Sequence, residues 1–333
     1  MLGRRPSAPP WRVYFALITA ALLWAALYPA AKPAVAASGP IQVTFCRLAL
    51  AFISLGAITL ARGGWRPILR HLRRQWRAVL VLGLGNFAVG QILAMLALVY
   101  LPASVNGLLN NTHPLWVAIG TAVFFQPRRP ALLVIGSATA LVGVGLVFLP
   151  SLPVGDSAPL QPLSGLGIAL SLAGSAVIAA GTAIGRRIMP GSSPLILTML
   201  ASGVAVVPMS VLVLLNGGFE PIVGAEPDIK VLLLFLGTGC TAMNYVLWYY
   251  GLKHLNAAAA SAFQYVIPPM SVVLAAVFLH EPLSTALIVG GLLIVAGLVA
   301  TQVASAGGSA VSAPAPEAPP RVERGRLAGD FDR

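Results

Sequence analysis

The amino-acid sequence predicts an all-α polytopic membrane protein, with ten transmembrane helices in two inverted five-helix repeats. Three observations predict this class: an apolar composition, basic segments that alternate between apolar runs, and a repeat within the chain. Of the 333 residues, 58% are hydrophobic and 9% are charged, and the mean hydropathy is +0.87. A soluble protein is about one-quarter charged, so this chain has too little polar surface to cover soluble domains.

Ten apolar windows are each long enough to cross a hydrocarbon core about 30 Å thick. They lie near residues 13–31, 41–61, 78–100, 104–125, 131–149, 166–185, 195–215, 230–250, 257–279 and 284–303. The predicted organisation is a cytoplasmic N-terminal tail (1–12), a first repeat (13–149), a linker (150–165), a second repeat (166–303) and a C-terminal tail (304–333). The last tail is rich in Ala, Pro, Gly and Ser and is expected to be disordered and cytoplasmic.

The basic residues test this span count independently. With a cytoplasmic N-terminus, fourteen lysines and arginines before the C-terminal tail fall in cytoplasmic segments, and only Lys32 and Lys230 fall on the opposite side. Such asymmetry over short loops follows the positive-inside rule and predicts a multi-pass protein of the inner or plasma membrane with both termini cytoplasmic. It also explains the net charge of +12 without a nucleic-acid partner. The fourteen residues are Arg4, Arg5, Arg12, Arg62, Arg66, Arg70, Arg73, Arg74, Arg77, Arg128, Arg129, Arg186, Arg187 and Lys253.

A shift of 154 positions superposes the second half of the chain on the first without a gap. Glycines and prolines are the informative matches, because each fixes local backbone behaviour. Five spans per repeat is an odd number, so the second copy must enter the membrane from the opposite side, as in many secondary carriers. The repeat also requires the first span, although Arg4–Arg5 and the later AVAAS imitate a cleavable signal peptide. The matched pairs include Gly83 with Gly237, Gly85 with Gly239, Pro114 with Pro268, Gly136 with Gly290 and Gly143 with Gly297.

Pro114 and Pro268 interrupt matching spans, within NNTHPLWV and QYVIPPMSV. Paired interruptions in two halves are the best sequence pointer to a binding site near the membrane midplane. Asn110 falls on Gln264, which is followed by Tyr265, so two amides are expected near the bilayer centre. The alternative is that both prolines only bend helices and the amides satisfy the freed backbone groups.

Two longer segments carry a family resemblance. Residues 278–300, FLHEPLSTALIVGGLLIVAGLVA, contain a Glu followed by a Gly-spaced helix; residues 24–51 contain a lysine at the end of the first span and an F-x-R in the second. Both resemble the EamA-type repeat of the drug/metabolite transporter superfamily. The resemblance assigns Lys32, Arg47 and Glu281 to family positions, whereas Pro127 stands where the first repeat would carry the counterpart of Glu281. It implies ten helices around a central cavity, and export or exchange of small metabolites.

Arg47 is the only formal charge well inside a predicted span, about six residues or roughly 9 Å from its end. An intramembrane arginine is a functional candidate by default, and the alternative is that it snorkels to the outer headgroups. Lys32, at a predicted span end, is expected to be an interfacial anchor or gate. No Asp or Glu falls inside a predicted span, which argues against a cationic drug as substrate. His113 could carry a coupling proton, or be an ordinary core histidine.

The remaining candidates are polar side chains in the third and eighth predicted spans. Asn244 and Trp248 share a helix face at i, i+4. Trp248 and Tyr249 lie near the predicted cytoplasmic edge and are assigned to an interfacial aromatic belt, whereas Asn244 and Tyr245 lie deeper. A GxxxG spacing at residues 181–185 is compatible with a homodimer.

These patterns predict a secondary transporter that exports or exchanges a small polar metabolite, such as an amino acid, by alternating access. An enzyme is not expected, since HExxH and phosphate-loop motifs are absent, and no cofactor or metal is expected. The alternative is a membrane scaffold or sensor with a dry centre, in which the arginine-rich loop 62–77 binds a partner. The expected substrate pathway is Arg47, Asn86, Gln91, Asn110, His113, Pro114, Asn244, Tyr245, Gln264, Tyr265 and Pro268, and the expected gate or interface residues are Lys32, Trp248 and Glu281.

Overall fold

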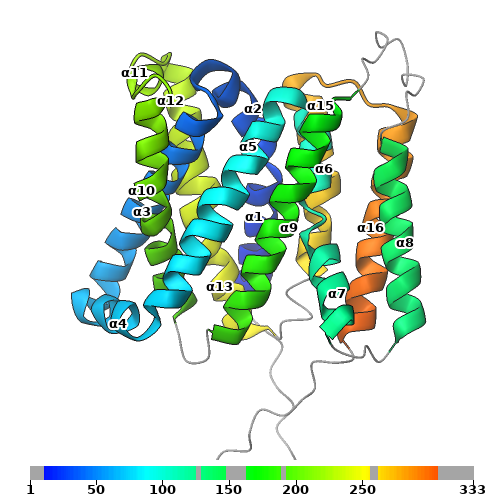
Figure 1. Ribbon diagram of the computed structural model, residues 1–333, viewed down its shortest axis with the longest axis horizontal. Helices are drawn as coiled ribbons and strands as arrows, with labels where there is room; N and C mark the ends of the chain where they lie inside the picture. Colours follow the sequence, from blue (N-terminus) through cyan, green and yellow to red (C-terminus); the bar gives the residue numbers. More distant parts are fainter. Residues whose placement is uncertain (1–10, 125–128, 148–162, 189–192, 256–261, 307–333) are drawn as a thin grey trace, which may run out of the picture.

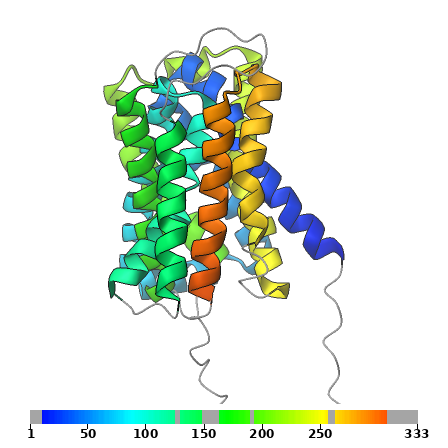
Figure 2. The same ribbon diagram turned by 90° about the vertical axis from the view of Figure 1, so that its right-hand side faces the viewer.

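The computed structural model describes residues 11–124, 129–147, 163–188, 193–255 and 262–306, and this part of the chain contains helices and no strand. Figure 1 shows the helices standing side by side, and Figure 2 shows α1 leaning away from the bundle at its N-terminal end. The elements are α1 (Trp11–Ala25), α2 (Leu27–Ser38), α3 (Pro40–Gly63), α4 (Trp65–Val81), η1 (Leu82–Gly90), α5 (Gln91–Tyr100), α6 (Ala103–Asn110), α7 (His113–Phe124), α8 (Pro130–Val147), α9 (Gly165–Ile188), α10 (Pro194–Leu215), α11 (Glu220–Val223), α12 (Pro227–Leu234), η2 (Phe235–Met243), α13 (Asn244–His254), η3 (Phe263–Val266), α15 (Ile267–Leu279) and α16 (Thr285–Ala306).

Seven continuous helices in the described ranges are long and apolar enough to cross a membrane, and two shorter apolar helices, Gly165–Gly181 and Phe263–Leu279, lie among them. The prediction of apolar helices is therefore confirmed, whereas the predicted span 104–125 is divided into α6 and α7. Most of the predicted tails (1–12 and 304–333), most of the linker and Pro127 lie outside the described residues.

Two helices extend well beyond their predicted bounds. The first continues to Ser38 rather than ending near residue 31, with one turn residue at Ala26 between α1 and α2. The arginine-rich segment predicted as a loop is mostly helix α4, which leads into η1. Arginines and apolar residues alternate there with helical periodicity, which favours an amphipathic helix over a loop.

A π-helical segment lies at matching positions in the two halves. The nine-residue segments η1 and η2 begin at Leu82 and Phe235, one residue from the 154-residue offset. Each is followed by an α-helix that ends in an extended residue, Leu101 (φ −122°, ψ 151°) and Leu255 (φ −117°, ψ 151°). π-Helical turns are rare and are frequent at functional sites, so the shared feature marks both segments for closer inspection.

The prolines of the sequence repeat also occupy matching positions. Pro114 is the second residue of α7, which follows the turn at Asn111–Thr112, and Pro268 is the second residue of α15, which follows the 3₁₀ turn η3. Proline is tolerated in the first turn of a helix because its missing N–H has no intrahelical acceptor there.

Helices α8 and α16 are equivalent in the sequence repeat and pack against each other in antiparallel directions. A Cβ atom added at Gly136 would lie 3.0 Å from the carbonyl of Gly297, and one at Gly143 would lie 2.6 Å from that of Gly290. Position increases along α8 as it decreases along α16, so the rotation that exchanges these helices is perpendicular to their axes. Because these glycines have no side chains, the backbones of α8 and α16 can come into contact.

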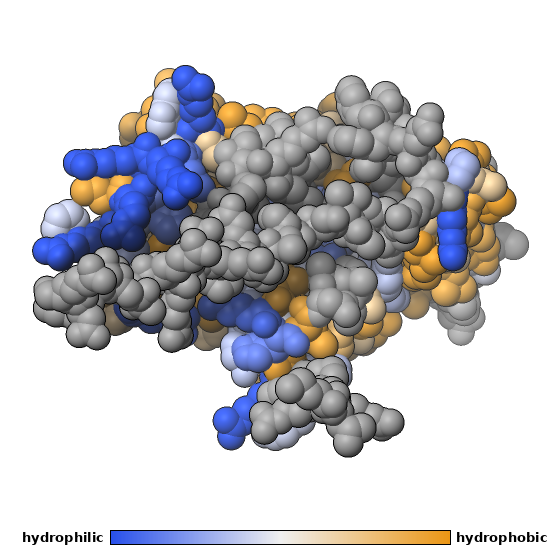
Figure 3. Space-filling view, turned by 90° about the horizontal axis from the view of Figure 1, so that it is seen from below, coloured by the Kyte–Doolittle hydropathy of each residue, from blue (hydrophilic) through white to orange (hydrophobic). Residues whose placement is uncertain are grey.

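The two ends of the bundle differ in charge. At the lower end in Figure 1, where α4 lies, Arg12, Arg62 and Lys253 line one pocket; we name this the arginine end. Figure 3, which views the molecule from this end, shows hydrophilic side chains gathered over part of the face. At the upper end, α11 begins with Glu220 and the first turn of α12 contains Asp228, and we name it the acidic end.

Candidate functional site

Arg47 lies on α3 and joins the two π-helical segments inside the bundle. Its Nε donates to the Oγ1 of Thr241 in η2 at 2.8 Å, and its Nη1 donates to the Oε1 of Gln91, the residue after η1, at 2.8 Å. The side chain is only 4% exposed. These contacts are directed into the bundle, so the side chain does not snorkel.

The described neighbours of this guanidinium carry no carboxylate. The ionisable groups that interact with Arg47 electrostatically are those of Tyr28, Tyr245 and Cys240. Two of its five N–H donors are used by Gln91 and Thr241. A buried cation without an anionic partner is costly, so the site is prepared to receive negative charge or further hydrogen-bond acceptors.

A second polar group surrounds Asn110 at the end of α6. The hydroxyl of Tyr28 on α2 donates to the Oδ1 of Asn110 at 2.5 Å, and the Nδ2 of Asn110 donates to the backbone carbonyl of Ser171 on α9 at 3.2 Å. All three residues are buried. Tyr28 is near both Asn110 and Arg47, so it connects the interruption between α6 and α7 to the buried guanidinium.

Three aromatic residues of α13, Tyr245, Trp248 and Tyr249, contact other helices. Tyr245 and Tyr249 are stacked with ring centroids 5.8 Å apart, and the Tyr249 hydroxyl is 3.0 Å from the Oγ1 of Thr198 on α10. Trp248 packs on Trp24 of α1 at 5.4 Å. The side chains of Trp248 and Tyr249 thus both contact other helices, and their assignment to an interfacial aromatic belt stays a prediction.

A pocket of about 570 Å³ opens at the arginine end. It lies between α1, α3, α10 and α13, and Tyr249 forms part of its wall. Tyr249 stacks on Tyr245, and Tyr245 interacts electrostatically with Arg47. The two tyrosine rings therefore lie between the pocket and Arg47. The lining residues are Arg12, Phe15, Ala16, Thr59, Arg62, Gly63, Pro67, Ser193, Pro194, Leu195, Ile196, Val246, Leu247, Tyr249, Tyr250 and Lys253.

Lys32 and Glu281 hold opposite sides of the α5–α6 turn at the acidic end. The Nζ of Lys32 donates to the carbonyls of Leu98 and Leu101 at 2.5 and 2.7 Å. The two carboxylate oxygens of Glu281 accept from the amides of Ala103 and Ser104 at 2.6 and 2.8 Å. We name this arrangement the turn clamp. It stabilises a helix C-terminus with a cation and a helix N-terminus with an anion. Lys32 lies within α2, which continues to Ser38, and its role as an anchor or gate stays a prediction.

The other residues of the predicted substrate pathway make fewer contacts with the groups around Arg47 and Asn110. Asn86 packs at Gly181 of α9, and His113 hydrogen-bonds the backbone of Asn110. Gln264 and Tyr265 are half-buried in η3. Asn244 is fully buried and its Oδ1 has no hydrogen-bond partner in the described part of the chain.

Sequence reasoning missed Tyr28, Thr241, Tyr249 and Thr198 as site residues. Tyr28 and Thr241 gave no local signal, because a lone tyrosine or threonine in an apolar span has many packing roles. Their importance follows from side chains that lie 82 and 194 positions away in the sequence, Asn110 and Arg47.

Known proteins show where this arrangement belongs. The EamA-like transporter family matches residues 11–149 and 165–302, which are the two halves of the repeat. An uncharacterized transporter of Archaeoglobus fulgidus is 26% identical over 83% of this chain and 93% of its own length. A probable terminal-alkyne amino-acid exporter of Streptantibioticus cattleyicolor is 24% identical over 86% and 92%. A solved crystal structure superposes with a TM-score of 0.60 at 22% identity, covering 89% of this chain and 98% of the other, which shows the fold alone. The chain is a membrane protein that belongs to the EamA-like transporter family.

Proposed function

We propose that this transporter is a ten-span secondary carrier that exports or exchanges a small polar metabolite with a carboxylate, such as an amino acid, by alternating access. Its termini lie in the cytoplasm and its membrane is the inner or plasma membrane. The observation that carries the substrate class is the buried guanidinium of Arg47, which has hydrogen-bond partners but no carboxylate among its described neighbours.

The antiparallel packing of equivalent helices supports the inverted repeat. Gly83 packs on α10 at Ala201 and Val204, and its counterpart Gly237 packs on α3 at Arg47 and Leu50, which are the equivalent positions at the 154-residue offset. The same contact is thus made by each half on the other. An alternating-access cycle can use such symmetry, because the two halves can exchange conformations about a fixed centre.

The arginine end supplies a route to that centre. The positive-inside rule assigns this end to the cytoplasm, so the 570 Å³ pocket is a cytoplasmic vestibule. Its three basic side chains, those of Arg12, Arg62 and Lys253, attract an anionic group before it reaches the tyrosine pair. Beyond that pair, Arg47 offers the planar donor set that suits a carboxylate.

The amino-acid exporter among the relatives is consistent with this substrate class. The test is efflux of an amino-acid mixture from proteoliposomes that contain the purified full chain. Arg47→Gln is expected to reduce efflux of the transported solute by about 100-fold, since the carboxylate of the bound solute would lose its charged partner. Arg47→Lys keeps the positive charge but loses the planar pair of guanidinium donors. Its efflux rate is expected to lie between those of the wild type and Arg47→Gln.

Arg129→Gln is the matched control, because Arg129 is exposed and begins the chain segment before α8. Decarboxylated amines, which lack the carboxylate, should not compete with the transported solute. Equal flux of the wild type and Arg47→Gln would contradict the proposal, and absence of flux for every solute would favour the scaffold or sensor alternative.

A further inference from the structure

Helix α4 has two chemically different sides, and neither is fully covered by the bundle. Five arginines lie close together along it, and Arg66, Arg70 and Arg74 follow one another at spacings of four residues on one side of the helix. Trp65 is 62% exposed and Trp76 is 51% exposed. The arginines are Arg66, Arg70, Arg73, Arg74 and Arg77, and all five are exposed.

The position of α4 brings this surface to the level of the lipid headgroups. It follows the membrane-crossing helix α3 after a turn at Gly64 (φ +69°), and it leads directly into η1. The Nε2 of His71 accepts a hydrogen bond from the amide of Ser193, the residue before α10, at 2.9 Å. The helix is therefore held beside the ends of two crossing segments, where exposed tryptophan is characteristic of the membrane interface.

The arginines have no acidic partner among the described residues. The described carboxylates are those of Glu220, Glu226, Asp228 and Glu281, which lie in α11, in α12 and its preceding residue, and at the acidic end next to α6. Arg77 lies over the ring of Trp76 at 5.3 Å. Positive charge is thus concentrated on α4 without an ion pair in this part of the chain to neutralise it.

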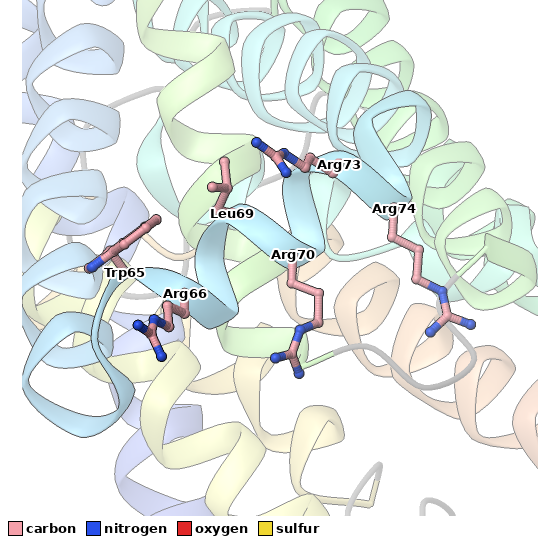
Figure 4. Close-up of a pocket in the computed structure, with 6 residues that line it drawn as sticks. All are labelled: Trp65, Arg66, Leu69, Arg70, Arg73 and Arg74. Atoms are coloured by element: carbon pink, nitrogen blue, oxygen red, sulfur yellow. The ribbon is translucent and has the colours of Figure 1, made fainter.

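The arginine side chains frame an open groove of about 590 Å³ along α4. Figure 4 shows Arg66, Arg70 and Arg74 extending from one side of the ribbon, with Leu69 and Arg73 on the other. Trp65 closes one end. Guanidinium groups beside a tryptophan and a leucine match a ligand that has a phosphate next to an apolar chain.

We propose that α4 is a binding surface for anionic phospholipids, in which the arginines hold phosphate headgroups and Trp65, Leu69 and Trp76 rest against the acyl chains. An amphipathic helix with arginines on its polar side and tryptophans on its apolar side has this preference. Binding itself does not depend on the proposed transport function; its assignment to the cytoplasmic leaflet depends on the orientation proposed above.

The test is native mass spectrometry of the detergent-solubilised full chain, titrated with phosphatidylglycerol or phosphatidylcholine. The wild type is expected to bind phosphatidylglycerol in preference. Replacing Arg66, Arg70, Arg73 and Arg74 together by Gln should weaken phosphatidylglycerol binding by roughly tenfold or more, since each basic residue contributes to attraction. The corresponding four-Lys variant should retain most of the binding and shows that folding is intact.

The matched control removes two exposed basic residues elsewhere, with Arg129→Gln and Lys230→Gln, and should leave lipid binding unchanged. Equal binding of the two lipids, or full binding by the four-Gln variant, overturns the proposal. If inorganic phosphate displaces the lipid completely, the site is a simple anion site, and if the four-Gln variant loses binding to polyglutamate but not to lipid, α4 docks an acidic protein instead; both results also overturn it.

Discussion

The two ends of the bundle differ in how the halves of the chain meet: by direct hydrogen bonds at the acidic end, and around a pocket at the arginine end. At the acidic end, Glu281 of the second half binds the start of α6 in the first half, and Lys32 binds the end of α5. At the arginine end, a pocket of about 570 Å³ lies between α1, α3, α10 and α13. Under the proposed alternating-access function, this difference corresponds to a state that is closed at the turn clamp and open toward the arginines.

The two halves differ in the side chain at the position of Glu281. Leu101 and its counterpart Leu255 have nearly the same extended conformation, so both halves make the same exit from their helix. The sequence offset pairs Glu281 with Pro127, which has no carboxylate to accept from backbone amides. The sequence repeat therefore supplies a carboxylate at this position in the second half and none in the first.

Breaking the turn clamp is expected to have the largest effect on the difference in accessibility between the two ends of the bundle. Glu281→Gln replaces a charged acceptor of two amide hydrogen bonds, and hydrogen bonds to a charged group contribute about 1.5–3 kcal/mol each. The acidic end should become roughly tenfold more accessible or more. The measurement is the rate at which a membrane-impermeant maleimide labels Leu101→Cys in a chain with Cys46→Ala and Cys240→Ala.

A second cysteine separates a shift between states from local unfolding. Leu195→Cys lies in the pocket of the arginine end, and its labelling should slow when Glu281→Gln opens the acidic end. The same cysteines with Glu281 retained are the reference. Unchanged labelling at both positions would show that the turn clamp does not hold the acidic end closed.

Filling the pocket is expected to have an intermediate effect. Ser193→Trp places a large side chain in the pocket, while the Ser193 side chain makes no cap hydrogen bond that would be lost. Transport should become several-fold slower because the vestibule is narrowed. Ser193→Ala is the small control and should transport like the wild type; if the two variants behave alike in flux assays, the pocket is not on the route.

The smallest effect is expected at the bottom of the pocket. Thr198→Val removes the partner of the Tyr249 hydroxyl at nearly constant volume and should lower the free energy of unfolding by about 0.5–1.5 kcal/mol. Tyr249→Phe removes the other partner. In thermal unfolding, the double variant should lose less than the sum of the two single losses, because both remove the same hydrogen bond. Additive losses would mean that this hydrogen bond contributes little.

The sequence predicted the helical class, the repeat and the broken helices because these follow from composition, a constant offset and proline chemistry. It also selected Arg47, Gln91, Asn110 and Glu281, since polar groups in apolar spans are conspicuous. It did not predict which side chains meet. One of the two partners of Arg47 is Thr241 and the partner of Glu281 is the α5–α6 turn, and both contacts depend on how helices from different halves pack.

The helix character of α4 was missed for a different reason. Its arginines suggested a loop between membrane spans, although their spacing also suits a helix that lies at the interface. Tyr28 was missed because its importance comes from the hydrogen bond to Asn110, which no local sequence pattern predicts.

The glycine contacts between α8 and α16 restrict how the duplicated halves can diverge. Gly136 meets Gly297 and Gly143 meets Gly290, so each close approach involves one residue from each copy. A methyl group at any of the four positions would push apart both backbones, including the copy in which nothing had changed. Positions 127 and 281 carry different residues, Pro and Glu, whereas a change at any of these four glycines would affect both copies of the duplication.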